Sequence, residues 1–380
     1  MGRIYLDNAA TTPVRPEAAE AMLPLLGGYN ASSLHAEGRA ARAALDAARA
    51  TVARTLNAAP REIVFTGGGS ESIALALLGA ANARERGHLI TSAIEHQAVL
   101  RAAEILENDG WRVTRLAVDA NGLVAPEPFA RALDDGATLA SIAYANNEIG
   151  VVQPVARLAA LARERGVGFH TDAIQAPGWL PLDVESLGVD LLSLSAHKFE
   201  GPKGAGVLYV RRGTELAPLV VGGGQEHGLR AGTEDVPGIA ALARALELAE
   251  SERPARVPAV AALRDRLQAG ILAAIPEVRV NAAGAPRLAS ILSVAFADVP
   301  GDALLIRLDL EGIAASAGSA CAAGSLEPSH VVAELGLEER YRNGVIRFSL
   351  GRTTSPGQID EVIRLLPALV ADVRSPAAVR

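Results

Sequence analysis

Short apolar runs that alternate with helical segments are the feature that most constrains the fold of this chain. In its first half each run is too short for a helix and is bounded by glycine, proline or polar residues, as is typical of buried strands. Strands alternating with helices imply an α/β fold, with a mostly parallel sheet covered by helices on both faces. The predicted strands are Ile63–Phe65, His88–Thr91, Trp111–Val118, Leu139–Tyr144, Val167–His170, Asp190–Leu194 and Gly206–Val210.

Chemically reactive side chains recur at the ends of these predicted strands. Ligands of parallel sheets bind beyond the carboxyl ends of the strands, so we expect these side chains to meet at one edge of the sheet. Each alone has a simpler explanation as an ordinary loop or capping residue, and it is their shared position that points to a site. They are Gly69, Ser70, His96, Asn147, Asp172, Gln175, Ser195, His197 and Lys198.

Two of these positions suggest particular chemistry. Lys198 follows a buried strand, where desolvation favours the uncharged amine that a Schiff base to an aldehyde requires. The glycine-rich segment from Thr66 to Ser72 joins a strand to a helix, so its amides can approach an anion such as phosphate. That segment is neither a P-loop nor GxGxxG, and a plain glycine turn capped by Ser70 is an equal alternative.

Taken together, the side chains are those that pyridoxal 5′-phosphate requires. A lysine Schiff base and an acidic partner for the ring nitrogen, here Lys198 and Asp172, are the recurring protein contributions to this cofactor. His96 offers a flat ring for stacking, and Gln175 or Asn147 can donate to a phenolic oxygen. The predicted phosphate contacts are Gly69, Ser70, Ser195 and His197.

The length and the net charge of the chain limit the number of domains and the classes of binding partner that we expect. The chain has 380 residues, enough for two domains, and its net charge of −7 argues against nucleic acid or an anionic membrane as the main partner. We expect no transmembrane helix and no signal peptide, because charged and polar residues interrupt every apolar stretch. A single cysteine, Cys321, excludes an internal disulfide framework and favours a cytoplasmic location.

A charged, proline-containing break at Ser251–Pro258 is the predicted domain boundary. We expect residues 16–255 to form a large cofactor-binding domain. Residues 1–15 and 256–380 are expected to form a smaller α+β domain, which carries the small-residue loop around Cys321.

Over essentially its whole length the chain resembles the NifS/IscS-type cysteine desulfurases of the class V aminotransferase group. The motifs that carry the resemblance are YLDNAATTP (5–13), SSLH (32–35), EIVFTGGGSES (62–72), IEHQAVL (94–100), NNEIGVVQP (146–154), HTDAIQ (170–175), SAHKFEGPKG (195–204), GGGQEHGLRAGT (222–233), SAGSAC (316–321), LEPSH (326–330) and IRFSLGR (346–352). The resemblance implies the pyridoxal-phosphate-dependent transferase fold type I, with a seven-stranded sheet and a smaller α+β domain.

The resemblance also implies roles for individual residues. Lys198 is expected to form the internal aldimine and then to act as acid and base. Cys321 is expected to take sulfur from L-cysteine as a persulfide, leaving L-alanine, with His96 as a candidate base. Arg347 matches the clamp for the substrate carboxylate, and Asn147 lies near the cofactor and the substrate. Thr233 matches a phosphate contact from a second subunit, so a homodimer is implied.

By the same resemblance, the sulfur passes to an acceptor protein such as an Fe–S scaffold, or serves tRNA thiolation or other thiocofactors. A selenocysteine lyase or another class V aminotransferase is the nearest alternative, although a transaminase needs no thiol. A non-catalytic paralogue is a further alternative that the intact site residues disfavour. The seven histidines lack zinc-site spacing, so we expect no metal site.

The sequence departs from the family pattern at a few positions. Ala31 stands where proline is common, Ser70 where threonine is common, Glu200 where tyrosine or a similar residue is common, and His227 where arginine is common. Little of the chain follows Val373, so the C-terminal tail is expected to be short. These departures leave the predicted chemistry in place and leave the choice of partner open.

Overall fold

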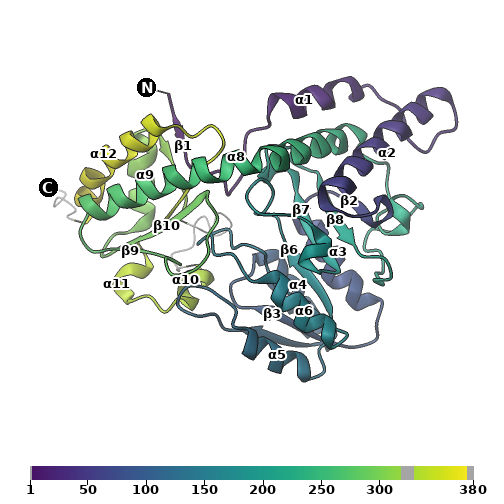
Figure 1. Ribbon diagram of the computed structural model, residues 1–380, viewed down its shortest axis with the longest axis horizontal. Coiled ribbons are helices and arrows are strands. Elements are labelled where there is room, and N and C mark those ends of the chain that lie inside the picture. Colours follow the sequence, from purple (N-terminus) through teal and green to yellow (C-terminus); the bar gives the residue numbers. More distant parts are fainter. Residues whose placement is uncertain (1, 318–328, 375–380) are drawn as a thin grey trace.

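A seven-stranded sheet forms the centre of the larger part of the molecule in the computed structural model, which describes residues 2–317 and 329–374 (Figure 1). Strand β8 is antiparallel to both of its neighbours, and the other pairs are parallel, which confirms the predicted mostly parallel sheet. The strands, in spatial order, are β2 (Ile63–Thr66), β8 (Gly206–Val210), β7 (Leu191–Ser195), β6 (Gly168–Asp172), β5 (Leu139–Ser141), β3 (His88–Ser92) and β4 (Arg112–Leu116).

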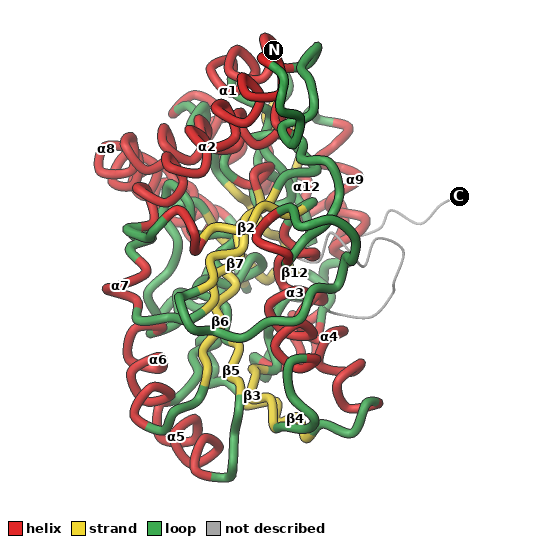
Figure 2. The backbone as a smooth tube through the Cα atoms, turned by 90° about the vertical axis from the view of Figure 1, so that its right-hand side faces the viewer, coloured by secondary structure: helices red, strands yellow, loops and turns green. Residues whose placement is uncertain are grey.

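Helices cover both faces of this sheet, which is why its inner strands are almost entirely buried, their polar residues included. In Figure 2 the strands are seen nearly edge-on, with α3 (Gly69–Asn82) and α4 (Gln97–Asn108) on one side. The opposite side carries α5 (Pro126–Asp134), α6 (Val155–Glu164) and α7 (Val184–Leu187). Helices α5 and α7 were not predicted from the sequence.

A second, three-stranded antiparallel sheet forms the smaller part of the molecule, in the order β12 (Val345–Ser349), β10 (Ile291–Phe296), β9 (Val278–Val280). Strand β1 (Ile4–Tyr5) pairs in parallel with β11 (Ile313–Ala314), so the first residues of the chain pack with its last third. The helices of this part are α9 (Gly301–Leu310), α10 (His330–Glu334), α11 (Glu339–Arg342) and α12 (Pro356–Arg374).

Helix α8 (Val236–Ala274) shows that the predicted break at Ser251–Pro258 is wrong. The helix runs on through Pro254 and Pro258 and crosses from one part of the molecule to the other (Figure 1). Proline weakens a helix by removing one hydrogen bond and crowding the preceding turn. Here the apolar residues before the prolines pack in the core of the large sheet, and those after them pack in the core of the small sheet. Packing at both ends keeps the helix continuous.

This change of core along α8 supports two domains, and we propose that division, although its predicted boundary falls inside the helix. Two further helices, α1 (Pro16–Met22) and α2 (Ala36–Leu56), pack on the first half of α8. Within the described part of the chain, no helix is long and apolar enough to cross a membrane.

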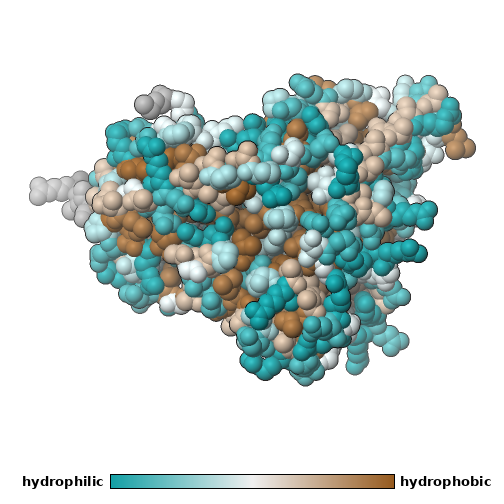
Figure 3. Space-filling model, in the orientation of Figure 1, coloured by the Kyte–Doolittle hydropathy of each residue, from teal (hydrophilic) through white to brown (hydrophobic). Residues whose placement is uncertain are grey.

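The segment that joins α1 to α2 projects from the molecule at the upper right of Figure 1. It exposes large apolar side chains, namely Leu23, Leu26, Tyr29 and Leu34. The space-filling view shows hydrophobic atoms at the same projecting tip (Figure 3). Such a cluster of exposed apolar side chains is typical of a surface that binds another protein.

Candidate active site

The carboxyl ends of the parallel strands open into a cavity of about 280 Å³. Most of the predicted site residues meet there. Those that line the cavity are Gly69, Ser70, His96, Asn147, Asp172, Gln175, Ser195, His197, Lys198 and Arg347. Thr233 is exposed and does not line the cavity of its own chain, and Cys321 lies outside the described residues.

Lys198 ends a short 3₁₀ turn that directly follows β7. Its Nζ donates to the backbone carbonyls of Ala9 at 2.6 Å and Ala10 at 2.8 Å. The side chain of Gln175 donates to the same Ala9 carbonyl at 3.0 Å. The segment just after β1 therefore forms one wall of the cavity. The motif around Ala9 was recognised in the sequence, but its residues were not predicted to belong to the site.

Asp172 is the last residue of β6 and is almost completely buried. Its Oδ1 accepts the backbone N–H of Ile174 at 2.9 Å, which fixes the carboxyl group. Burial raises the pKa of Asp172, and the nearby charges on His96 and Lys198 oppose that rise. A buried carboxyl group of this kind gains from a cation placed against it, such as a protonated ring nitrogen.

His96 caps the first turn of α4. Its Nδ1 accepts the backbone N–H of Ala98 at 3.0 Å, so in the neutral ring the proton is on Nε2. Burial lowers the pKa of His96, and Lys198 and His330 lower it further, whereas Asp172 raises it. The arrangement favours a neutral imidazole whose Nε2 is the nitrogen left to exchange a proton in the cavity.

Three titratable residues that the sequence analysis missed also line the cavity: Glu95, Glu148 and His330. Burial raises the pKa of Glu95 to about 8, and its carboxyl group accepts from the hydroxyl of Ser92 at 2.6 Å and from the backbone N–H of Ala143. Glu95 and Glu148 directly adjoin His96 and Asn147 in the sequence, so adjacency to predicted residues was the available signal for these two. His330 ends the motif LEPSH, which contains no predicted site residue.

Glu148 and His330 are held by contacts at the rim of the cavity. Burial raises the pKa of Glu148, whose Oε2 accepts the hydroxyl of Ser329 at 2.6 Å. His330 donates from Nε2 to the backbone carbonyl of Glu95 at 2.9 Å and accepts from the side chain of Gln97 at 3.2 Å. These contacts tie the start of α10 to the wall that carries His96.

Arg347 enters the cavity from β12, so the smaller sheet contributes directly to the site. The residue is 1% exposed, and its Nη1 donates to the backbone carbonyl of Asn147 at 2.8 Å. Its Nη2 donates to the carboxylate of Asp7 at 2.7 Å. These contacts fix the plane of the guanidinium group at the cavity wall. Asn147 meets Arg347 through its backbone.

The opposite end of the cavity is shaped for an anion. Gly69 and Ser70 begin α3, and a Cβ at Gly69 would clash with the side chain of Ile174. Gly68 has φ of 142°, which residues with a Cβ rarely adopt. The N-terminal amides of α3 can therefore be approached closely by a negatively charged group. Burial lowers the pKa of His197 to about 4, so its ring is neutral at pH 7.

The residues present fit pyridoxal 5′-phosphate. An amine, a buried carboxyl group, an imidazole and a helix N-terminus surround one cavity, and each suits a different part of that cofactor. The described residues contain no group of three or more histidine, cysteine or acidic side chains placed to hold a metal ion.

Thr233 lies just before α8, at the end of the loop 222–233. Glu226 anchors this loop, because its carboxylate pairs with the guanidinium of Arg49 at 2.5 Å and accepts the backbone N–H of Phe65 at 2.8 Å. Both partners of this pair are buried, and Glu226 and His227 both adopt positive φ. The loop is thus fixed in a conformation that leaves Thr233 on the outside.

Comparisons with known proteins extend over nearly the whole chain. A family model described as Aminotransferase class-V matches residues 4–362. The cysteine desulfurase IscS of Methanosarcina thermophila is 46% identical over 376 residues, which cover 98% of this chain and 93% of that protein. A solved NifS-like protein superposes with a TM-score of 0.91 at 35% identity, covering 97% of this chain and 99% of the other. The structure of SspA in complex with cysteine superposes with a TM-score of 0.82 at 38% identity, covering 93% of this chain and all of the other.

Proposed function

The chain belongs to the aminotransferase class-V family, and we propose that it is a pyridoxal-phosphate-dependent cysteine desulfurase that converts L-cysteine to L-alanine. The fold is that of the NifS-like proteins, of fold type I. The observation that carries the proposal is the single cavity in which Lys198, Asp172 and Arg347 meet. The solved relative with bound cysteine supports the same substrate.

We propose that Lys198 holds the cofactor covalently and that Asp172 pairs with its ring nitrogen. His96 would supply the flat side chain that stacks on the ring, and Gln175 and Asn147 would supply partners for its phenolic oxygen. The phosphate contacts are Gly69, Ser70, Ser195 and His197, together with Thr233 of a second subunit. When bound, the cofactor supplies an acceptor for the electron pair released at the α-carbon of an amino acid.

The remaining steps belong to side chains of this protein. Arg347 binds the substrate carboxylate, because a guanidinium group can form two parallel hydrogen bonds with it. Once the substrate amine has displaced it, the amine of Lys198 takes a proton from the α-carbon and returns it. His96 exchanges protons through Nε2, since Nδ1 is engaged with the backbone of α4.

Cys321 is the proposed nucleophile. Its thiolate forms a bond to the substrate sulfur while the carbon–sulfur bond breaks, and the carbon then takes up a proton. L-alanine leaves, and the sulfur remains as a persulfide on Cys321. This role rests on the motif SAGSAC (316–321) and on the relatives named cysteine desulfurase.

We further propose a cytoplasmic homodimer that delivers sulfur to an acceptor protein such as an Fe–S scaffold. The exposed position of Thr233 and the apolar segment between α1 and α2 support contact with a second copy. The name IscS of the similar proteins supports a role in Fe–S assembly. Nothing in the described residues favours a selenocysteine lyase, another aminotransferase or a non-catalytic paralogue.

Replacement of the proposed nucleophile tests the function. Wild-type protein should produce L-alanine and sulfide from L-cysteine in the presence of a reductant. Cys321→Ser should still bind L-cysteine, seen as a change in the absorption of the bound cofactor, and should release no sulfide. Undiminished sulfide release would remove Cys321 from the mechanism. Activity on L-selenocysteine that survives the substitution, without activity on L-cysteine, would favour a lyase.

A further inference from the structure

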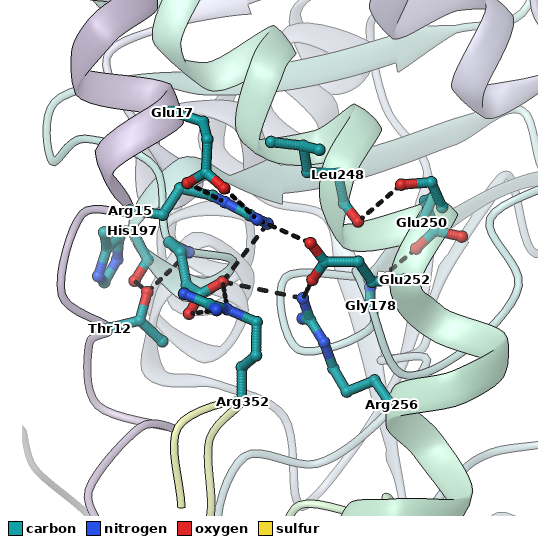
Figure 4. Close-up of polar contacts among 12 residues, drawn as sticks. Thr12, Arg15, Glu17, Gly178, His197, Leu248, Glu250, Glu252, Arg256 and Arg352 are labelled. Atoms are coloured by element: carbon teal, nitrogen blue, oxygen red, sulfur yellow. Dashed lines mark hydrogen bonds and ion pairs between the residues drawn. The ribbon is translucent and has the colours of Figure 1, made fainter.

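A cluster of ion pairs surrounds Glu200, which stands two residues after Lys198. Figure 4 shows Arg15, Glu252, Arg256 and Arg352 directed toward one another. We call the group the Glu200 cluster, after the carboxylate that three of its arginines face. Its members are Arg15, Glu17, Glu200, Glu252, Arg256 and Arg352.

Glu200 stands two residues after Lys198, and its side chain is 12% exposed. Both of its oxygens accept from Nε of Arg352, at 3.1 Å and 3.0 Å. Oε2 also lies 3.7 Å from Nη1 of Arg15 and 3.8 Å from Nη2 of Arg256. One carboxylate therefore faces three guanidinium groups that come from three separate segments of the chain.

The backbone of Glu200 is fixed as well. Its φ is 66°, a left-handed conformation that is uncommon without a glycine. Its N–H donates to Oγ1 of Thr12 at 2.7 Å, and its carbonyl accepts the N–H of Arg15 at 2.9 Å. The hydroxyl of Thr12 in turn donates to the carbonyl of His197 at 2.9 Å. A strained conformation of this kind persists only where several contacts impose it.

These contacts connect the segments that carry Lys198 and Arg347, the two residues that act on the substrate in the proposed function. Lys198 ends the 3₁₀ turn two residues before Glu200, and Arg352 stands three residues after the end of β12, the strand that carries Arg347. Arg256 belongs to α8, which packs in both cores. The ion pairs of Glu200 thus join the turn of the large sheet to the strand of the small sheet.

An α-amino acid holds its amine and its carboxylate on one carbon. In the proposed function the amine joins the cofactor at the position that Lys198 holds, and Arg347 binds the carboxylate, so Lys198 and Arg347 must stand at one fixed separation. We propose that Glu200 is a positioning residue that sets the separation between Lys198 and Arg347. The proposal rests on the proposed function, because it assigns those two residues to the substrate. A displacement of about 1 Å can cost roughly 100-fold in such a site.

The test compares Glu200→Gln with Glu17→Gln in the cofactor-loaded enzyme. Glu17 pairs with the same Arg15, is more exposed, and makes no pair with Arg352, so it is a matched control. Glu200→Gln should raise KM for L-cysteine by about tenfold and lower kcat as well, because Lys198 must reach the α-carbon to move its proton. It should raise to a similar extent the L-alanine concentration that half-saturates the absorption change of the bound cofactor. Glu17→Gln should stay within about twofold of wild type in both measurements.

Arg352, which pairs with Glu200, provides an independent variant. Arg352 is more exposed than Glu200, so Arg352→Met should fold even if Glu200→Gln does not. It should show the same rise in KM. The double variant should be no worse than the more severe single variant, because both break one connection. Multiplicative effects on KM would overturn the proposal.

A purely structural role predicts a different result. Glu200→Gln would then lower the melting temperature and leave KM and the L-alanine concentration unchanged, which would also overturn the proposal. Failure of the wild-type protein to bind the cofactor or L-alanine would count against the proposed function instead. The two failures are therefore distinguishable.

Discussion

At the scale of single residues, His96 combines a structural contact with a chemical one. Its Nδ1 caps α4, while the ring lines the cavity. Asparagine is a good helix cap and cannot exchange a proton, so it separates the two contributions. His96→Asn should reduce L-alanine production by about 100-fold or more, with little change in the free energy of unfolding.

His96→Ala should lose activity to the same extent and cost about 1 kcal/mol of stability as well, because the cap is lost. Urea unfolding and an L-alanine assay on both variants measure the two quantities separately. An asparagine variant that keeps wild-type activity would show that His96 contributes only the cap.

Glu95 allows a prediction about pH. Its pKa is raised by burial from 4.5 to about 8, so the folded protein retains a proton that the unfolded chain releases between these values. The contribution of Glu95 to the free energy of unfolding is therefore full below about pH 4 and falls as the pH rises toward 8.

Glu95→Gln removes this titration. We expect the stability of the variant, relative to wild type, to improve between pH 5 and pH 8 by up to a few kcal/mol. Urea unfolding at both pH values measures it, with Glu85→Gln as an exposed control. A difference between variant and wild type that does not change with pH would show that Glu95 is ionised in the folded protein.

At the scale of elements, the buried pair of Arg49 and Glu226 joins α2, β2 and the loop 222–233. Arg49 also donates to the carbonyl of Ile63 at 2.6 Å, and its guanidinium lies 4.7 Å from the ring centre of Phe65. Removing one charge leaves the other buried without its counter-ion, which costs about 3–5 kcal/mol. Because β2 leads into the glycine-rich start of α3, the same pair supports the phosphate end of the cavity.

We therefore expect Glu226→Gln to lower the free energy of unfolding by about 3–5 kcal/mol in urea. The matched control is Glu247→Gln, which removes an exposed carboxylate paired with Arg54 and should cost less than about 1 kcal/mol. If the two substitutions had equal effects, the buried pair would not be the anchor of the loop.

The elements also show where prediction from sequence succeeds and where it stops. Most strands of the large sheet were predictable because they are short buried runs rich in apolar residues that end at glycine or polar residues, which is a local pattern. The prediction of a break within α8 was wrong. Proline disfavours a helix through local contacts, whereas the packing that keeps this helix continuous comes from two separate hydrophobic cores. Glu95 was missed although it directly precedes His96, whereas His330 was missed because only the fold brings it to this wall of the cavity.

At the scale of the whole molecule, the site is assembled from both sheets. The mostly parallel sheet and the meeting of strand ends followed from the alternation of strands and helices. The pairing of Arg347 with Asp7 and of Lys198 with the carbonyls of Ala9 and Ala10 did not, because no local pattern reports contacts between segments so far apart. The family resemblance supplied roles for Arg347, Thr233 and Cys321 that spacing alone could not.

The pairing of β1 with β11 has a consequence for folding during synthesis on the ribosome. Ile4 is among the first residues to emerge, and its neighbour Ile313 follows only after most of the polypeptide has been made. Arg347, the partner of Asp7 in an ion pair, is synthesised later still. A nascent chain that ends before Arg347 therefore cannot complete the substrate-binding wall of the pocket, although the large sheet that carries Lys198 and Asp172 has already been made.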